Sequence, residues 1–172
     1  MLHAAFARSP HAHAAIRGID KTAAAALPGV RAVLTAADLR PYLRNERLVV
    51  ALPSPSYKQE RNRPALAGIE AVHVGEPVAV VIAESRYIAE DAVEDIVVDL
   101  EPLEAVVDLE MALEPGSPLV HDDLESNLAA HLFQKKGDYE AARQQADLVL
   151  QRRIIIDRGA AAAMENRGIV AD

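Results

Sequence analysis

The stretch HVGEPVAVVIAESRYIAEDAVEDIVVDL, residues 73–100, carries the clearest succession of secondary-structure signals in the sequence. Residues 78–83 contain no polar side chain, which is typical of a β-strand that is buried on both faces. Ser85 can cap a helix over residues 85–96. Three apolar residues recur on one side of that helix: Ile88, Ala92 and Ile96. Strand-like residues return directly afterwards, and this strand–helix–strand order predicts the centre of an α+β fold.

The region before this stretch predicts further short elements. In order, these are strands at 2–8 and 13–19, a helix at 20–27, a strand at 30–35 and a short helix that begins at Thr35. Asp20 can cap the first of the two helices. Asp38 stands three residues after Thr35, which is the position of the acidic partner in a capping box. Residues 44–68 contain three prolines and are too long for an ordinary connection, so we expect a functional loop, a mobile loop or an excursion from the core.

The last part of the sequence begins at a linker-like Pro115-Gly116-Ser117-Pro118. A helix is predicted at 138–146 and a strand at 147–156, and the closing AAAAMENRGIVAD indicates another strand that is still in progress. We therefore expect one domain over residues 1–114 and the truncated start of a second over 115–172.

Composition and charge exclude several classes of protein. The 172 residues carry a formal net charge of −8 and the longest basic run is Lys135-Lys136, so a nucleic-acid-binding face is not expected. With no cysteine, the chain has no disulfide, thiolate zinc site or cysteine-ligated iron–sulfur cluster. This composition fits a reducing compartment, and we expect a cytoplasmic protein. No apolar run reaches the ~18 residues that a membrane-spanning helix needs.

A possible metal site is the pair His11 and His13. In a strand, residues i and i+2 face the same side, so both imidazoles could reach one ion. Retaining a metal needs at least a third ligand, and the other histidines are scattered: His3, His73, His121 and His131. Polar-face histidines, hydrogen-bonded or solvated, are the favoured interpretation.

The acidic and glycine motifs also favour structural roles. Carboxylates cluster in the predicted helix and after it: Glu90, Asp91, Glu94, Asp95, Glu101, Glu104, Asp108 and Glu110. They could bind Mg²⁺ or Ca²⁺, but a solvated acidic face is favoured because no calcium-loop pattern is present.

Gly75 precedes a strand instead of following one, so it indicates a turn with positive φ. Glu165 and Arg167 lie two residues apart and predict a structural ion pair. The residues thus provide no catalytic, cofactor-binding or metal-binding set.

Several stretches, in this order, are similar to the molybdenum-binding large subunit of the xanthine dehydrogenase, aldehyde oxidase and aerobic carbon-monoxide dehydrogenase family. They are RSPHAHAAIRGIDKTAAAALPGVRAVLTAADL, HVGEPVAVVIAESRYIAEDAVEDIVVDLEPLEAVVD, PLVHDDLESNLA, GDYEAARQQADLVL and MENRG. The last resembles a Met-Glu-Pro-Arg-Gly segment of the family, with Asn166 in place of proline. The resemblance covers nearly the whole chain, with residues 44–64 least clear.

The resemblance implies an α/β-hammerhead domain followed by the first elements of a molybdopterin-binding α+β domain. Members hydroxylate aldehydes, N-heterocycles or CO-type substrates with water as the oxygen donor. A molybdenum–pterin cofactor supplies the chemistry, and iron–sulfur clusters and FAD in partner domains carry the electrons. The cofactor-holding and catalytic stretches of the family lie beyond the MENRG segment, so no catalytic or cofactor residue can be carried over to this sequence.

The leading hypothesis is therefore a structural N-terminal fragment of a molybdenum hydroxylase large subunit, inactive alone. Its expected partners are the remainder of the large subunit and the iron–sulfur and flavin subunits, with possible self-association through exposed apolar residues. Two alternatives stay open: a non-enzymatic assembly module, and a small metal-binding protein that uses His11 and His13.

Overall fold

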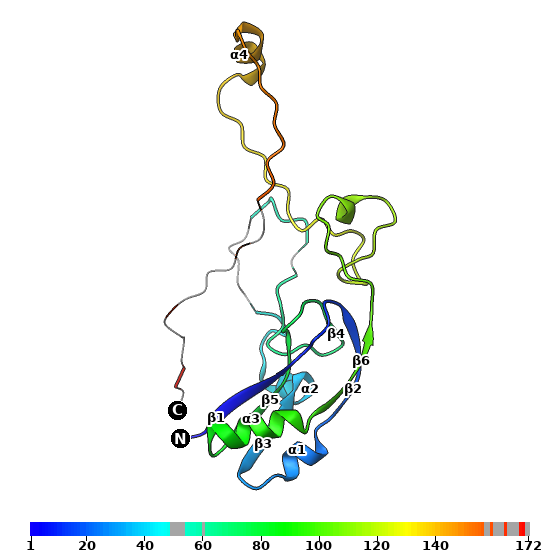
Figure 1. Cartoon of the computed structure of the whole chain (residues 1–172), viewed down its shortest axis with the longest axis vertical. Helices are drawn as coiled ribbons and strands as arrows, with labels where there is room; N and C mark the ends of the chain where they lie inside the picture. Colours follow the sequence, from blue (N-terminus) through cyan, green and yellow to red (C-terminus); the bar gives the residue numbers. More distant parts are fainter. Residues whose placement is uncertain (49–53, 60, 157–158, 160–163, 165–168, 171–172) are drawn as a thin grey trace. The chain divides into compact units, whose positions relative to one another are not determined.

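The computed structural model describes residues 1–48, 54–59, 61–156, 159, 164 and 169–170. The chain divides into two compact units, Met1–Phe133 and Gln134–Asp172, and each is described by itself. The strands of the first unit are β1 (His3–Arg8), β2 (Ala14–Asp20), β3 (Val30–Thr35), β4 (Glu70–Ala71), β5 (Pro77–Ala83) and β6 (Val97–Pro102). Its helices are α1 (Thr22–Ala26), α2 (Ala36–Leu39) and α3 (Arg86–Glu94), with 3₁₀ turns η1 (Arg40–Tyr42) and η2 (Met111–Leu113) (Figure 1).

The strands alternate between two antiparallel sheets along the chain. The odd-numbered strands form one sheet in the order β1-β5-β3, and the even-numbered strands form the other in the order β4-β2-β6. The predicted order of strand, helix and strand is confirmed, with β5 and β6 on either side of α3. These two strands belong to different sheets, so α3 connects the sheets and is not a crossover within one of them.

The central strand β5 forms the core, as its apolar run predicts. It pairs with β1 from His3↔Ala83 to Arg8↔Pro77, and with β3 from Val30↔Ala83 to Thr35↔Ala79. Val78 and Val81 are fully buried. Because both edges of β5 are paired and both faces are covered, apolar side chains are favourable at every position of the strand.

Helix α3 packs against β1 and β5 (Figure 1). The Ser85 side chain accepts a hydrogen bond from the backbone N–H of Ile88 at 3.2 Å, which confirms the predicted N-cap. Ala89, Ala92 and Ile96 are buried and Ile88 is half-buried, so the apolar stripe faces the core as expected. Small alanines at the buried positions let the helix lie close to the sheet.

The region around α2 is fixed by one carboxylate. Asp38 accepts hydrogen bonds from the backbone N–H and the hydroxyl of Thr35, both at 2.8 Å, and the first of these is the bond expected of the acidic residue in a capping box. The Lys21 ammonium donates to the same carboxylate at 2.5 Å and to the Val33 carbonyl at 3.0 Å. The Lys21 hydrogen bond, followed by those from Thr35, lowers the pKa of Asp38 to about 2. Asp38 thereby ties together the start of α1, β3 and α2.

The residues after β3 and after β6 form the loop region of the first unit. Isolated bridges join Arg47 to Pro64 and Tyr57 to Ala130, so the long connection returns to contact the chain that follows β6. The Gln59 side chain donates to the carbonyls of Ser126 and Leu128, at 2.7 and 3.1 Å. The described parts of the proline-rich stretch thus form an excursion held by the later segment, which agrees with one of the three expectations for it.

The second unit contains helix α4 (Tyr139–Gln145), close to its predicted bounds, with Asp138 accepting from the Ala141 backbone N–H at 3.1 Å. The strand predicted at 147–156 was wrong, because these residues pair with no strand among the described residues. A strand needs neighbouring backbone groups for its hydrogen bonds. Within the described parts of the chain, no helix is long and apolar enough to cross a bilayer.

Candidate functional site

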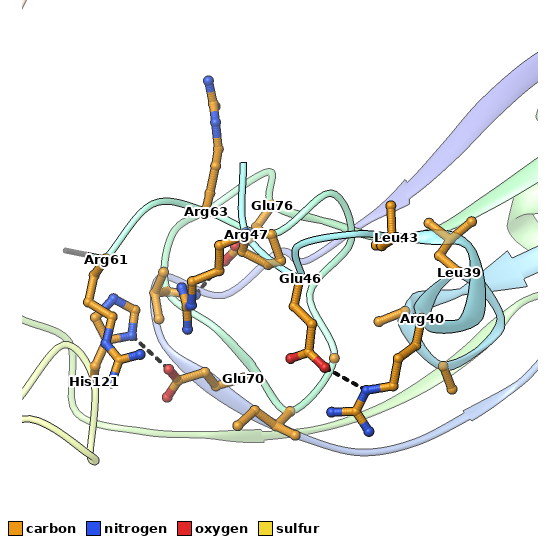
Figure 2. Close-up of a pocket in the computed structure, with 16 residues that line it drawn as sticks. Leu39, Arg40, Leu43, Glu46, Arg47, Arg61, Arg63, Glu70, Glu76 and His121 are labelled. Carbon is orange, nitrogen blue, oxygen red and sulfur yellow. Dashed lines mark hydrogen bonds and ion pairs between the residues drawn. The ribbon is translucent and has the colours of Figure 1, made fainter. Parts of the chain in front are cut away.

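A buried carboxylate joins two histidines on the β4-β2-β6 sheet. β4 is a two-residue strand that pairs with Ala14 and Ala15 of β2, and its first residue is Glu70. One oxygen of Glu70 lies 2.7 Å from Nδ1 of His121, and the other lies 3.8 Å from Nε2 of His13. All three side chains are at least four-fifths buried. We call His13, Glu70 and His121 the Glu70 cluster; Figure 2 shows its Glu70 and His121 members.

The tautomer of His13 follows from its second contact. Its Nδ1 lies 2.9 Å from the backbone oxygen of Glu104, and a carbonyl can only accept, so Nδ1 carries the proton. The buried Nε2 has no hydrogen-bond partner among the described residues. The 3.8 Å to Glu70 is too long for a hydrogen bond, so this contact is purely electrostatic and attractive only when the imidazole is cationic.

The proposed pairing of His11 and His13 depends on both lying in a strand. The structure ends β1 at Arg8 and begins β2 at Ala14, so both histidines lie in the connection between the strands and the alternation argument does not apply. His13 is committed to Glu104 and Glu70, whereas the backbone N–H of His11 donates to the Ser9 hydroxyl at 3.1 Å. In the part of the chain that the structure describes, no three His, Cys, Asp or Glu side chains gather as metal ligands.

A second buried carboxylate fixes the turn before β5. Glu76 is 2% exposed; it accepts from the Val72 backbone N–H at 2.7 Å and lies 3.5 Å from Nδ1 of His73. Ser9 joins the same turn, because its N–H donates to the Glu76 carbonyl and its own carbonyl accepts from Gly75 N–H. Gly75 has φ +85°, which confirms the predicted positive-φ turn. This network is a structural brace between the end of β1 and the start of β5.

A cavity of about 390 Å³ lies beside the Glu70 cluster. One wall is apolar and comes from α2, the end of η1 and the chain on either side of β4. It includes Ala36, Leu39, Leu43, Pro64, Ile69 and Val72. The polar wall holds four arginines, three glutamates and one histidine: Arg40, Arg47, Arg61, Arg63, Glu46, Glu70, Glu76 and His121 (Figure 2). A second hollow, of about 770 Å³, shares Arg47, Arg61 and His121 with it.

The acidic residues singled out in the sequence do not meet at one site. Glu90 pairs with Arg86 at 2.8 Å and Glu101 pairs with Arg17 at 2.5 Å, both on exposed surfaces. Asp91, Glu94 and Asp95 are exposed on α3, in agreement with the solvated face. Glu104 contributes its backbone carbonyl to His13. Glu165 and Arg167 lie outside the described residues.

The Glu70 cluster was not predicted, because its three members are separated by 51 residues or more and no local spacing signals them. His121 and His13 were noticed singly, and Glu70 was not noticed. Three of the four cavity arginines, Arg47, Arg61 and Arg63, lie within residues 44–64, where the sequence was least informative. The arginines come together only because the connection between η1 and β4 folds back on itself. No periodic pattern in the sequence indicates this path of the chain.

The described glycines fall into two groups according to the atoms around them. A Cβ added at Gly18, Gly75, Gly116, Gly137 or Gly159 would meet no atom within 4 Å. At Gly29 and Gly68 it would meet the protein's own Ile88 and Ala36. These two glycines therefore serve internal packing, and no cofactor chemistry is assigned to residues of this chain.

Comparison with known proteins agrees with this fold. Residues 1–104 match the family model described as aldehyde oxidase and xanthine dehydrogenase, a/b hammerhead domain. The chain therefore belongs to the aldehyde oxidase and xanthine dehydrogenase family and contains its hammerhead domain.

Individual relatives give the same result. The chain is 39% identical over 171 residues to the nicotine 6-hydroxylase large subunit of Paenarthrobacter nicotinovorans, covering 99% of this chain and 20% of that protein. It is 42% identical over 128 residues to the carbon monoxide dehydrogenase large chain of Afipia carboxidovorans, covering 74% and 15%. The chain thus spans a fifth or less of the length of these two relatives.

Solved structures share the architecture. The carbon monoxide-reduced Cu,Mo-CO dehydrogenase superposes with a TM-score of 0.67 at 37% identity, covering 86% of this chain and 19% of that one. Quinoline 2-oxidoreductase from Pseudomonas putida 86 superposes with a TM-score of 0.66 at 44% identity, covering 73% and 16%. The likeness in fold and sequence places this chain within the large subunits of molybdenum hydroxylases.

Proposed function

We propose that this chain is the structural N-terminal part of a molybdenum hydroxylase large subunit and is not catalytic by itself. The observation that carries the proposal is the use of its buried polar groups. Glu70, Glu76 and His13 are each bound to the chain's own backbone or side chains. Side chains held in this way connect distant parts of the chain and brace the fold, which supports a structural role.

In this proposal residues 1–114 act as the hammerhead domain and residues 115–172 begin the molybdopterin-binding domain. The oxidative hydroxylation of an aldehyde, N-heterocycle or CO-type substrate, with water as oxygen donor, takes place in longer polypeptide. The molybdenum–pterin cofactor is held there. Iron–sulfur and flavin subunits act as electron-transfer partners, and the complex works in the cytoplasm.

A chimera tests the structural role. Residues 1–104 replace the matching segment of the carbon monoxide dehydrogenase large chain of Afipia carboxidovorans, with which the chain is 42% identical over 128 residues. We expect the chimeric large chain to assemble, retain molybdenum and oxidise the substrate of its host. A chimera that assembles but loses molybdenum, or that oxidises different substrates, would contradict a purely structural role.

Two matched substitutions in that chimera separate folding from chemistry. Val78 is fully buried and Val97 is 65% exposed. We expect Val78→Asp to prevent assembly, because a buried unpaired carboxylate is strongly unfavourable, and Val97→Asp to leave it intact. Metal analysis of the isolated 172-residue chain gives a further check: stoichiometric molybdenum, or dye-coupled oxidation of an aldehyde or purine, would overturn the proposal.

A further inference from the structure

The cavity beside the Glu70 cluster combines an apolar wall with four arginines, of which Arg47 forms no ion pair with a described carboxylate. Its volume, about 390 Å³, lies within the ~300–1,000 Å³ that small-molecule sites occupy. Leu39 and Leu43 line one side together with Ile69, whose side chain is 80% exposed. An organic ligand could cover these apolar surfaces, and a solvated inorganic ion could not.

The carboxylates of the cavity already have partners. Glu46 pairs with Arg40 at 2.6 Å, and Glu70 pairs with His121 at 2.7 Å. Glu76 accepts the Val72 N–H at 2.7 Å and lies 3.5 Å from His73. Among the described residues, none of these three acids forms an ion pair with Arg47, Arg61 or Arg63. The pKa of Glu46 is lowered mainly by the hydrogen bond from Arg40. The positive charge of the more distant Arg47 lowers it further.

Two arginines retain binding capacity. Arg47 donates to the Asn62 carbonyl at 2.8 Å and makes no ion pair with a described carboxylate. Arg61 pairs with Asp123 through one terminal nitrogen, while its buried Nε has no hydrogen-bond partner among the described residues. A guanidinium carries five N–H donors, so Arg61 retains donors beyond the one that it gives to Asp123. Figure 2 shows Arg47 and Arg61 on the side of Glu70 and His121, and Arg63 directed away.

We propose that this cavity binds a small organic monocarboxylate. The carboxylate accepts hydrogen bonds from Arg47 and Arg61, and the apolar body lies against Leu39, Leu43 and Ile69. The planar guanidinium groups suit a carboxylate, with which they form charge-assisted hydrogen bonds. A phosphate dianion fits less well, because Glu70 lies on the same side of the cavity and repels the second charge. The site is independent of the molybdenum chemistry proposed above.

The test uses the 172-residue chain and two probes of nearly equal shape, 4-phenylbutyrate and its neutral amide, 4-phenylbutanamide. Isothermal titration or saturation-transfer NMR measures their binding at low ionic strength. We expect saturable binding of the acid and at least about 10-fold weaker binding of the amide, since the amide loses the charge-assisted hydrogen bonds. Equal binding of the two probes, or no saturable binding of the acid, would overturn the proposal.

Variants locate the site. Arg47→Gln and Arg61→Gln should each weaken binding of the acid by about 5–20-fold, as expected for the loss of one charged hydrogen bond. Arg63→Gln is the matched control, because Arg63 borders the cavity but is directed away from it, and it should change affinity by less than about 2-fold. An effect of Arg63→Gln as large as that of Arg47→Gln would indicate non-specific charge attraction and contradict the site.

A fourth variant distinguishes ligand binding by Arg61 from a merely structural role. Asp123→Asn removes the partner of Arg61 and leaves its guanidinium free. We expect affinity for the acid to be kept or raised, because Arg61 gains donors for the ligand. If the ion pair serves only to fold the loop, Asp123→Asn will abolish binding as Arg61→Gln does. That result would overturn the assignment.

Discussion

The carboxylate of Glu70 lies 2.7 Å from Nδ1 of His121, although 51 residues separate them in the chain. This contact attaches the segment after β6 to the short strand β4 and hence to the centre of the β4-β2-β6 sheet. The same carboxylate faces His13 at 3.8 Å, just before β2. One side chain therefore connects three distant parts of the first unit.

Removing this carboxylate should destabilise the first unit. Glu70→Ala leaves His121 and His13 buried without their acidic partner, and we expect a loss of about 1–3 kcal/mol in the free energy of unfolding. Urea unfolding followed by circular dichroism measures it. The control is Glu101→Ala, whose pair with Arg17 is more than half exposed and should contribute less than about 1 kcal/mol. Equal losses in the two variants would contradict a bracing role for Glu70.

Asp38 should make stability depend on pH in the acidic range. Its pKa is lowered from 3.8 to about 2 by the hydrogen bonds from Lys21 and Thr35. A carboxyl group with a lowered pKa in the folded state stabilises the protein above its unfolded pKa, and this stabilisation is lost as pH falls through the folded value. The contribution is therefore complete near pH 6 and falls to about half by pH 3.

The variant Asp38→Asn isolates this contribution. Both Asp38 and Lys21 are about one third exposed, so after allowance for solvent screening we expect a loss of about 1 kcal/mol at pH 7. The difference between wild type and variant should shrink as pH is lowered from 6 to 3 in urea unfolding experiments. A difference that stays constant over this range would show that Asp38 does not titrate as described.

Gly75 and Gly18 form a matched pair for testing backbone conformation. A Cβ at either position would meet no atom within 4 Å, but only Gly75 has a positive φ, of +85°. Gly75→Ala should therefore lower the free energy of unfolding by about 1–2 kcal/mol through backbone strain alone. Gly18→Ala should be neutral within about 0.5 kcal/mol. Similar effects of the two substitutions would mean that the positive φ is not maintained in solution.

The second unit should promote self-association of the isolated chain. Ile154 and Ile156 are 81% and 87% exposed, and neighbouring residues of the same unit are also apolar and exposed. Such surfaces associate in water. We expect the mass from light scattering to rise with concentration and the double variant Ile154→Asp, Ile156→Asp to reduce this rise.

The control for the double variant at Ile154 and Ile156 adds the same negative charge to the first unit. Val107 and Leu109 are 85% and 88% exposed, and the double change to aspartate there should leave association unchanged. A wild-type chain that remains monomeric at high concentration would refute the prediction. Equal effects of the two double variants would assign the change to net charge and not to the second unit.

The sequence predicted elements whose signals are local. The buried run of β5, the Ser85 cap and the Thr35–Asp38 arrangement each depend on neighbouring residues, and each is confirmed. The assignment of β5 and β6 to different sheets could not be predicted, because pairing depends on contacts between distant segments. For the same reason Glu70, in a two-residue strand without periodicity, was missed, and Arg47 and Arg61 were not recognised as neighbours.

The strict alternation of strands between the two sheets has a consequence for synthesis. β1 and β3 pair with β5 and not with each other, so a growing chain that has not yet reached Pro77 holds two strands with no hydrogen-bonding neighbour. The same applies to most of β2, which waits for β6. The β1-β5-β3 sheet therefore lacks its central strand until about residue 83, and the β4-β2-β6 sheet lacks β6 until about residue 102. The nascent polypeptide can complete the first sheet before the second, and until then its strand edges are open to pairing with other chains.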